Sequence, residues 1–255
     1  MRVPLPTYGS ILAVMWFPLD TYAASEERFI PDCAGRVEIA HAHVLRVDPN
    51  GAMILPDGRA LLLEGIRLPD TGPLADQTVI ALRSLTGAST VTFTTASPKD
   101  DRYGRIRVQG FGRQWLQAAL LEQGLARVSI SPDRDECAPD LYEAEYRART
   151  QRLGIWALAS YRVRTPEEMK DTVGSFQLVE GRVTSVGQAD GRQFIDFGNR
   201  RIFSAVIAPQ DRRAFRDFDF EGLSQRRIRL RGIVQDYRGR PEIALSNPYQ
   251  IEVLD

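Results

Sequence analysis

The sequence has very little lysine or histidine, and its charges cancel. Lys99 and Lys170 are the only lysines among 255 residues, so arginine supplies nearly all of the positive charge. The formal net charge is zero, so no overall field draws the chain toward nucleic acid or an anionic membrane. His41 and His43 are the only histidines, and we expect them on a solvated strand face with no metal bound.

The chain also lacks an apolar run of membrane-spanning length. The stretch Ile11 to Leu19 is far shorter than the ~20 residues that a span needs, and Pro18 interrupts it. Arg2 before this stretch and small residues ending at Ser25 give residues 1–25 the pattern of a secretory signal, with an uncleaved anchor as the alternative. We therefore expect a periplasmic or secreted protein that has no contact with the membrane once the signal is cleaved.

Cysteine is scarce as well, because Cys33 and Cys137 are the only two. Both follow the predicted cleavage site, and an even pair in an exported protein is most simply a disulfide. Two free thiols would fit a cytosolic chain better. A disulfide closing a loop of this length would be worth about 4–5 kcal/mol in the chain-entropy model.

Apolar alternation and turn residues divide the chain into two sets of strands. The first set predicts strands at 37–47, 52–55, 60–66, 91–93 and 105–111, and helices at 74–85, 114–123 and 142–153. In the last helix, Glu143–Arg147 and Glu145–Arg149 have the spacing of ion pairs worth a few tenths of a kcal/mol each. Residues 160–174 are polar, and we interpret them as a linker. The second set predicts strands at 176–186, 193–197, 201–207, 228–234 and 242–245, with a helix at 211–218.

In both sets a helix follows the third strand, which is the order of a five-stranded OB-type barrel. The predicted fold class is therefore mainly β with α, built from two OB-type barrels. The predicted domains are residues 26–159 and 175–255, joined by the linker.

Three motifs stand in order in the first half of the chain. They are Leu62-Leu63-Glu64-Gly65-Ile66-Arg67-Leu68-Pro69-Asp70, then Asp101-Arg102-Tyr103-Gly104-Arg105, then Gly154-Ile155-Trp156. Together they resemble the staphylococcal-nuclease (thermonuclease-like) domain, over about residues 36 to 157. The resemblance implies an OB barrel with three helices packed outside it. Residues 175–255 resemble the small OB-like tails that follow exported nuclease-like domains.

The resemblance implies phosphodiester hydrolysis by a carboxylate, two arginines and a Ca²⁺ ion held by carboxylates. Arg105 falls on the second catalytic arginine, and Asp70 falls on the catalytic glutamate with a side chain one methylene shorter. Leu62 stands in place of the first catalytic arginine, while Arg67 and Ala52 stand in place of metal-binding aspartates. Losing one charge-stabilising donor typically costs 10²–10³ in rate, and here the metal ligands are replaced as well.

Two charged residues close to Leu62 do not restore this chemistry. Arg59 is three residues away and so falls on the opposite face of a strand. Glu64 shares the face of Leu62 but occupies a neutral position of the family pattern. We expect no bound metal and no cofactor, and a protein that is not a working enzyme.

The leading prediction is an exported, catalytically degenerate member of the family that binds single-stranded nucleic acid or an envelope protein. The alternative is a weak or altered phosphodiesterase that uses Asp70 and Arg105, and only this alternative calls for Ca²⁺. In the second barrel Tyr237, in a turn with Arg238 and Arg240, is the best candidate for a binding contact. The sequence makes no prediction of oligomeric state.

Two observations count against nucleic-acid binding by the second barrel. The other aromatic residues of the second barrel, Phe194, Phe197 and Phe203, could also stack on bases, but they stand at alternating strand positions and most of them are expected in its core. Residues 174–255 hold 13 basic and 11 acidic groups, a smaller surplus than a dedicated polyanion binder would carry.

Overall fold

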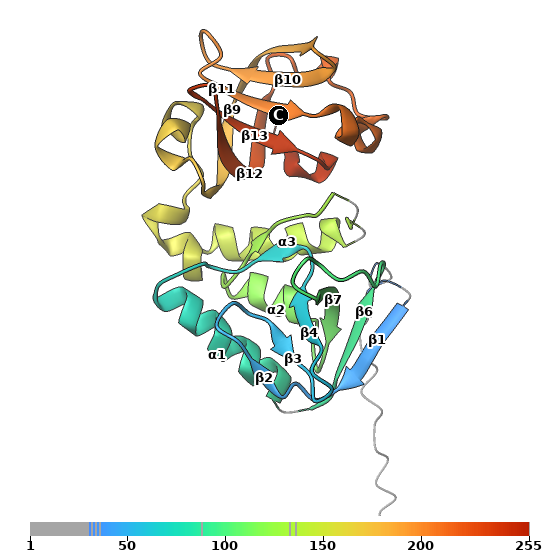
Figure 1. The fold of residues 1–255 in the computed structure, drawn as a ribbon. Coiled ribbons are helices and arrows are strands. Elements are labelled where there is room, and N and C mark those ends of the chain that lie inside the picture. Colours follow the sequence, from blue (N-terminus) through green and yellow to red (C-terminus); the bar gives the residue numbers. More distant parts are fainter. Residues whose placement is uncertain are drawn as a thin grey trace, which may run out of the picture.

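The described chain folds into two β-barrels placed one above the other (Figure 1). The computed structural model describes residues 31, 33, 35, 37–87, 89–132, 134–135 and 137–254. The predicted secretory signal at residues 1–25 lies outside them. Among the described residues, no helix combines the length and the apolar character needed to cross a bilayer.

The first barrel is a sheet that closes on itself. Its strands are β1 (Val37–Ala42), β2 (Arg46–Val47), β3 (Met53–Ile54), β4 (Ala60–Leu63), β6 (Val91–Thr95) and β7 (Arg105–Phe111). The spatial order is β1-β6-β7-β4-β3-β2, and β4 pairs with β7 in parallel. Because β1 and β2 are successive parts of one stretch of chain, the two ends of this order meet. The result is the OB-type arrangement that the sequence predicts.

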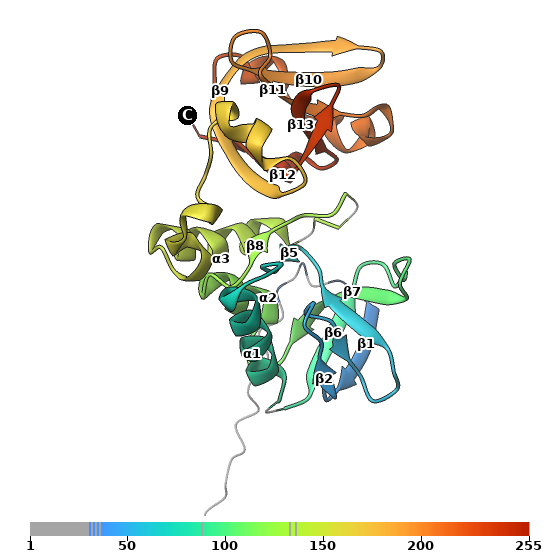
Figure 2. The same ribbon diagram turned by 60° about the vertical axis from the view of Figure 1, so that its left-hand side comes forward.

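The helices α1 (Pro73–Gly87), α2 (Leu116–Glu122) and α3 (Ala138–Thr150) pack outside this barrel, and α3 lies between the two barrels (Figures 1 and 2). The core contains Leu61, Phe93, Phe111, Leu116 and Leu120, each at most 1% exposed. Burying a side chain of this kind contributes about 1.5–3 kcal/mol. The helix α3 begins four residues earlier than predicted, because a proline occupies its first turn, where a missing N–H costs nothing. The short 3₁₀ helix η1 (Gly154–Ala157) follows α3.

A kink at Glu64–Gly65 sends the chain out of the barrel. Gly65 has φ +80°, and a Cβ there would lie 2.5 Å from Cδ1 of Leu141. Only glycine adopts this conformation without strain, and the space for a side chain is already filled. After the kink β5 (Ile66–Arg67) pairs with β8 (Arg127–Val128), with Arg67 opposite Arg127.

The second barrel closes through a direct pairing of β12 with β13. Its strands are β9 (Phe176–Ala189), β10 (Arg192–Phe197), β11 (Phe203–Ile207), β12 (Arg227–Tyr237), β13 (Arg240–Leu245) and, beside β12, β14 (Ile251–Val253). The order is β13-β11-β10-β9-β12-β14. The 3₁₀ helices are η4 (Pro209–Phe215), η5 (Glu221–Leu223) and η6 (Pro248–Gln250). This confirms the predicted fold class, mainly β with α in OB-type barrels.

The polar segment 160–174 packs against the second barrel. It includes η3 (Pro166–Thr172), which follows η2 (Ala159–Tyr161). Thr165 and Glu168 form a capping box at the start of η3, as their spacing suggests. Met169 is fully buried in the core of the second barrel, so the segment that we interpreted as a linker also contributes to that core.

The predicted disulfide is present. Cys33 and Cys137 are joined by an S–S bond of 2.09 Å across a sequence separation of 104 residues. The bond ties the chain just before β1 to the residue that precedes α3. The prediction from the cysteine pair is therefore confirmed.

The two barrels meet through a buried ion-pair network. Arg231 of β12 is 1% exposed and lies 2.9 Å from Glu145 of α3 and 2.6 Å from Glu252 of β14. Its Cζ also lies 4.3 Å from the ring centre of Tyr142. Helical spacing pairs Glu145 with Arg149, but Glu145 is 1% exposed and forms its ion pair with Arg231 across the interface, while the predicted pair of Glu143 with Arg147 is present.

Candidate functional site

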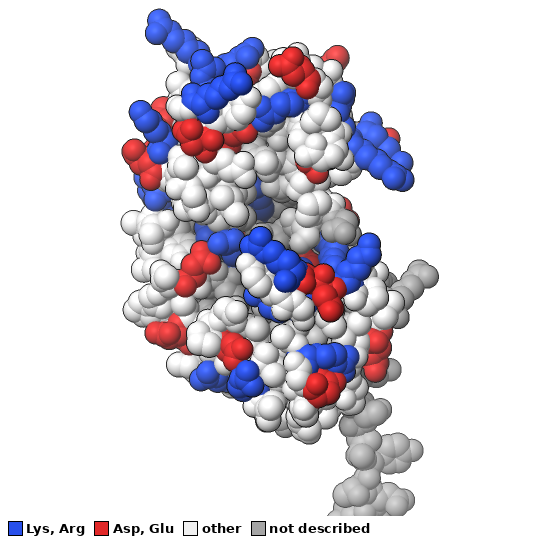
Figure 3. Space-filling model, viewed as in Figure 1, with Lys and Arg blue, Asp and Glu red and all other residues white. Residues whose placement is uncertain are grey.

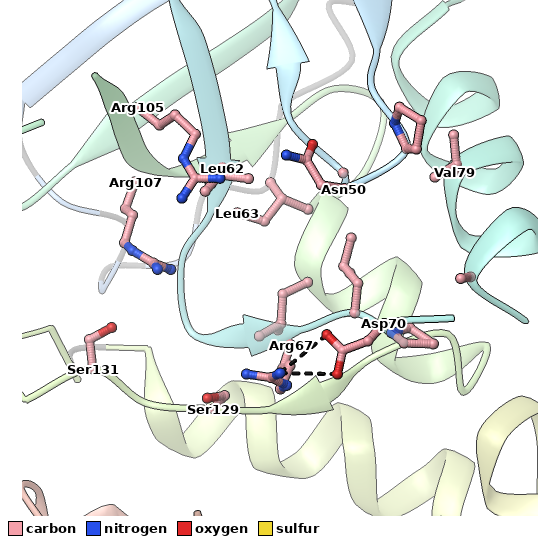
Figure 4. A pocket seen from close by; sticks show the side chains of 16 residues that line it. Asn50, Leu62, Leu63, Arg67, Asp70, Val79, Arg105, Arg107, Ser129 and Ser131 are labelled. Carbon is pink, nitrogen blue, oxygen red and sulfur yellow. Dashed lines mark hydrogen bonds and ion pairs between the residues drawn. The ribbon is translucent and has the colours of Figure 1, made fainter. Parts of the chain in front are cut away.

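A pocket of about 450 Å³ opens in the first barrel where the chain leaves it at the kink. The strands β4 and β7 form one side, and β5 and the residues after β8 form the other (Figure 4). The first and second sequence motifs both reach this pocket. Its lining residues are Pro49, Asn50, Gly51, Leu62, Leu63, Ile66, Arg67, Leu68, Pro69, Asp70, Ala75, Val79, Arg105, Arg107, Ser129 and Ser131.

Asp70 and Arg67 form an ion pair at the edge of this pocket. The Arg67 Nη2 donates to both carboxylate oxygens of Asp70, at 3.1 and 3.0 Å. By the sequence resemblance, Asp70 falls on the catalytic glutamate, and Arg67 replaces an aspartate that would bind the metal. The Asp70 carboxylate is therefore held by an arginine that occupies the position of a metal ligand.

Arg105 also lines the pocket, from the first residue of β7. Its guanidinium lies 2.8 Å from the carboxylate of Asp101, which also accepts hydrogen bonds from the backbone amides of Tyr103 and Arg105. Burial acts to raise the pKa of Asp101, but these hydrogen bonds and the Arg105 charge outweigh it and lower the pKa to about 2. Asp101 is thus a permanent anion that holds the Arg105 turn in place.

Arg107 lies in the pocket beside Leu62, and the sequence reasoning missed it. The two residues are partners across the parallel β4–β7 pair, so the β7 strand brings a guanidinium to the pocket where β4 supplies a leucine. Figure 4 shows Arg105 and Arg107 on one side of the pocket and the Arg67–Asp70 pair across from them. The sequence did contain a signal for Arg107, because side chains two residues apart on a strand share a face and Arg105 was already predicted to lie in the site.

Neither Glu64 nor Arg59 lines the pocket. Glu64 is 5% exposed, and its carboxylate accepts from Ser131 Oγ at 2.6 Å and from Arg134 at 3.2 Å. The same carboxylate lies 4.0 Å from Nε of Arg107, so it also forms a long ion pair with this pocket residue. Arg59 is absent from the lining and instead pairs with Asp57.

The donor set does not fit Ca²⁺. Ala52 is 3% exposed and carries no ligand atom, and Asn50 uses its side-chain oxygen to accept from the Ala52 amide. Hard divalent cations need several oxygen ligands, with carboxylates among them. Among the described residues that line the pocket, arginines outnumber acids three to one, and the acid is already paired. No cluster of three potential metal ligands occurs anywhere in the described part of the chain.

The second barrel supports the Arg67 edge of the pocket. Phe176, the first residue of β9, lies 5.8 Å from the Arg67 Cζ and 4.7 Å from the Arg127 Cζ, measured to its ring centre. Arg127 also donates to the Phe176 carbonyl at 2.9 Å and stacks on Tyr161. Burial, with a smaller contribution from Arg67, lowers the pKa of Arg127 to about 10, against the attraction of Tyr161. Arg127 therefore remains a cation at neutral pH.

The turn residues singled out in the second barrel lie on a separate surface. Tyr237 is 43% exposed at the end of β12, and Arg238 and Arg240 are exposed beside it. They do not join the pocket of the first barrel. Phe197 and Phe203 are buried in the core, as expected of most of these rings, whereas Phe194 lies on the outer face of β10.

A comparison with protein families finds a match over part of the first barrel and the helices that follow it. Residues 63–158 match the family described as staphylococcal nuclease homologue. The match includes the second and third sequence motifs and most of the first. A comparison with curated proteins finds no match to the chain.

Proposed function

We propose that this protein, whose residues 63–158 form a staphylococcal nuclease homologue domain, binds the phosphate backbone of nucleic acid in its first barrel without metal and without hydrolysis. The observation that carries the proposal is the guanidinium of Arg107 beside Leu62, together with the Arg67–Asp70 ion pair. The pocket lining offers three arginines to an anion, and its one acid, Asp70, is already paired with Arg67.

Arginine is suited to this role, because its planar guanidinium presents several N–H donors that match the geometry of phosphate oxygens. Arg105 and Arg107 come from one face of a single strand, so their spacing is fixed by β7. The hydroxyl of Ser129 adds a neutral donor on the facing side, whereas Ser131 already donates its hydroxyl hydrogen to Glu64.

The excess of arginine over acid is a local property of the pocket lining. On the face shown in Figure 3, basic and acidic side chains are interspersed, in keeping with a net charge of zero. Binding would therefore depend on local contacts with phosphate and would weaken as salt rises.

Hydrolysis is disfavoured because the only carboxylate among the lining residues, Asp70, is already engaged by Arg67. The runner-up function is a weak or altered phosphodiesterase that uses Asp70 and Arg105. It requires that Asp70→Asn reduce any measured hydrolysis, and it fails if hydrolysis is unchanged.

We also propose that the protein is exported. The Cys33–Cys137 disulfide supports this, because such bonds persist in oxidising compartments and are rare in the cytosol. The pattern of residues 1–25 supports a cleaved signal. Detection of the mature protein outside the cytosol, with its amino terminus near residue 26, would test both parts.

The binding proposal is tested by fluorescence anisotropy with a labelled oligonucleotide in EDTA. Each charged hydrogen bond to phosphate is worth about 1.5–3 kcal/mol, so Arg107→Ala should raise Kd roughly 10- to 150-fold. Arg59→Ala is the matched control, since it removes the same charge from the same barrel outside the pocket. Equal affinity of the Arg107 and Arg59 variants would contradict the proposal, as would Ca²⁺-stimulated cleavage that Arg105→Ala abolishes.

A further inference from the structure

The outer face of the second barrel carries a row of alternating aromatic rings and guanidiniums. The Arg192 Cζ lies 5.3 Å from the ring centre of Phe194 and 4.7 Å from that of Tyr237. The Arg238 Cζ lies 5.3 Å from the same Tyr237 ring. We call Arg192, Phe194, Tyr237, Arg238 and Arg240 the Tyr237 face.

Strand alternation places these residues outside the barrel. In β10, Ile195 and Phe197 are at most 1% exposed and belong to the core, so Arg192 and Phe194 face outward. Tyr237 of β12 stands directly opposite Arg240 of β13. Side chains opposite each other across an antiparallel pair share a face.

A tight turn holds the exposed end of this face. Arg238 and Gly239 have φ values of 55° and 80°, the signs required by the two-residue hairpin turn that matches strand twist. The carboxylate of Asp236 accepts from the Gly239 amide at 3.0 Å and secures the turn. The ring of Tyr237 is therefore presented by a defined backbone and not by a loose loop.

Basic groups gather beside the rings. A pocket of about 390 Å³ adjoins the turn, and the basic residues that line it are Lys170, Arg200, Arg201 and Arg240. Glu167 also lines it, and Arg201 pairs with Asp196 at 3.0 Å. Within the described chain, no acidic side chain pairs with Arg238 or Arg240, so both keep their donors for a ligand.

We propose that the Tyr237 face binds single-stranded nucleic acid. An unpaired base stacks on the Tyr237 ring or on the Arg238 guanidinium plane, and the neighbouring phosphates contact Arg238, Arg240 and the adjoining basic pocket. Aromatic rings and arginine planes accept any unpaired base in this way. A duplex is excluded from the stacking contact because its bases are already paired and stacked. The inference rests on the proposed function, which supplies nucleic acid as the ligand. It adds that the second barrel prefers unpaired bases.

Anisotropy titrations of the purified full protein with a labelled single-stranded DNA, and with the duplex of the same sequence, test the inference. Tyr237→Ala should raise Kd for the single strand roughly 5- to 150-fold, with little change for the duplex. Tyr237→Phe keeps the ring and should bind as the parent does. Tyr249→Ala removes a similarly exposed tyrosine elsewhere on the same barrel and should also have no effect. An unchanged Kd for Tyr237→Ala, or an equal loss for both DNAs, would overturn the inference.

Arg238→Gly separates the phosphate contact from the stacking contact. Glycine is favoured at this positive φ, so the turn is kept while the guanidinium is lost. The slope of log K against log salt for the single strand should fall in magnitude by about 0.7. An unchanged slope would show that Arg238 makes no phosphate contact and would count against the proposed site.

Comparing Arg107→Ala in the first barrel with Tyr237→Ala in the second separates this inference from the proposed function. If Arg107→Ala weakens both DNAs while Tyr237→Ala weakens neither, the proposed function stands and this inference fails. If Tyr237→Ala weakens the single strand while Arg107→Ala has no effect, the pocket of the first barrel is wrong and the Tyr237 face stands.

Discussion

Replacing Arg231 by methionine tests how the two barrels are joined. Arg231 is 1% exposed and donates to Glu145, Glu252 and the Val128 carbonyl, the last at 3.0 Å. Methionine fills much of the same volume but leaves the carboxylate of Glu145, itself 1% exposed, without its cation. Glu252 keeps Arg229 at 3.0 Å, so the main loss falls on Glu145.

The expected cost follows from that orphaned charge. Removing one partner of a buried ion pair costs about 3–5 kcal/mol, much of it from the charge left behind. For a protein of this size each kcal/mol lowers Tm by about 2–4 °C, so Arg231→Met should lower Tm by roughly 6–20 °C. The double variant Arg231→Met with Glu145→Leu should recover a large part of the loss, because an apolar pair often replaces a buried ion pair at little cost.

Calorimetric or circular-dichroism melts of four proteins measure these effects. Arg227→Met is the matched control, since Arg227 lies on the same strand with its side chain 60% exposed and pairs with Glu180. Glu180 keeps Arg229 at 2.7 Å when Arg227 is replaced, and an ion pair with a solvent-exposed arginine is worth about 0–1 kcal/mol. If Arg231→Met costs no more than Arg227→Met, or if the double variant is less stable than the single one, the account of this interface is refuted.

Further predictions concern the disulfide, the kink and acid stability. Replacing Cys33 and Cys137 by alanine should cost about 4–5 kcal/mol in the chain-entropy model, and a reductant should lower the Tm of the parent but not of the variant. Gly65→Ala should be less stable than Gly58→Ala in thermal melts. Both glycines have positive φ, but of the two only Gly65 has another atom within 4 Å of an added Cβ. Equal losses of stability would rule out crowding at the kink. Burial raises the pKa of Glu252, but its arginine partners outweigh this and lower it below the ordinary value of 4.5. The stabilising effect of the Glu252 carboxylate is therefore complete above about pH 4.5 and is lost as pH falls through its lower folded pKa. Thermal melts in which Tm does not decline below pH 4.5 would contradict this.

Local sequence patterns predicted most of the fold. The alternation from Arg105 to Phe111 has the bounds of β7, and the cysteine pair predicted the disulfide. Turn residues and strand order predicted both OB-type barrels. Each of these features depends on residues close together in the chain, or on composition alone.

The site was less accessible because it depends on pairing between distant segments. Arg107 shares a strand face with Arg105, but only the parallel register puts it beside Leu62, 45 residues earlier. Arg192 and Tyr237 likewise meet only through the barrel. Glu145 has the helical spacing of a surface pair, but the docking of the second barrel buries it against Arg231. Register and docking are tertiary properties that local periodicity does not encode.

The most direct test of the central claim is a calorimetric titration with a nucleoside 3′,5′-bisphosphate and with Ca²⁺. The pocket holds Arg67, Arg105 and Arg107 with one paired acid, Asp70, so the bisphosphate should bind in EDTA and Ca²⁺ alone should release no heat. Ca²⁺ should not increase the affinity for the bisphosphate. Heat from Ca²⁺ alone, bisphosphate binding only when Ca²⁺ is present, or no bisphosphate binding at all would contradict the account.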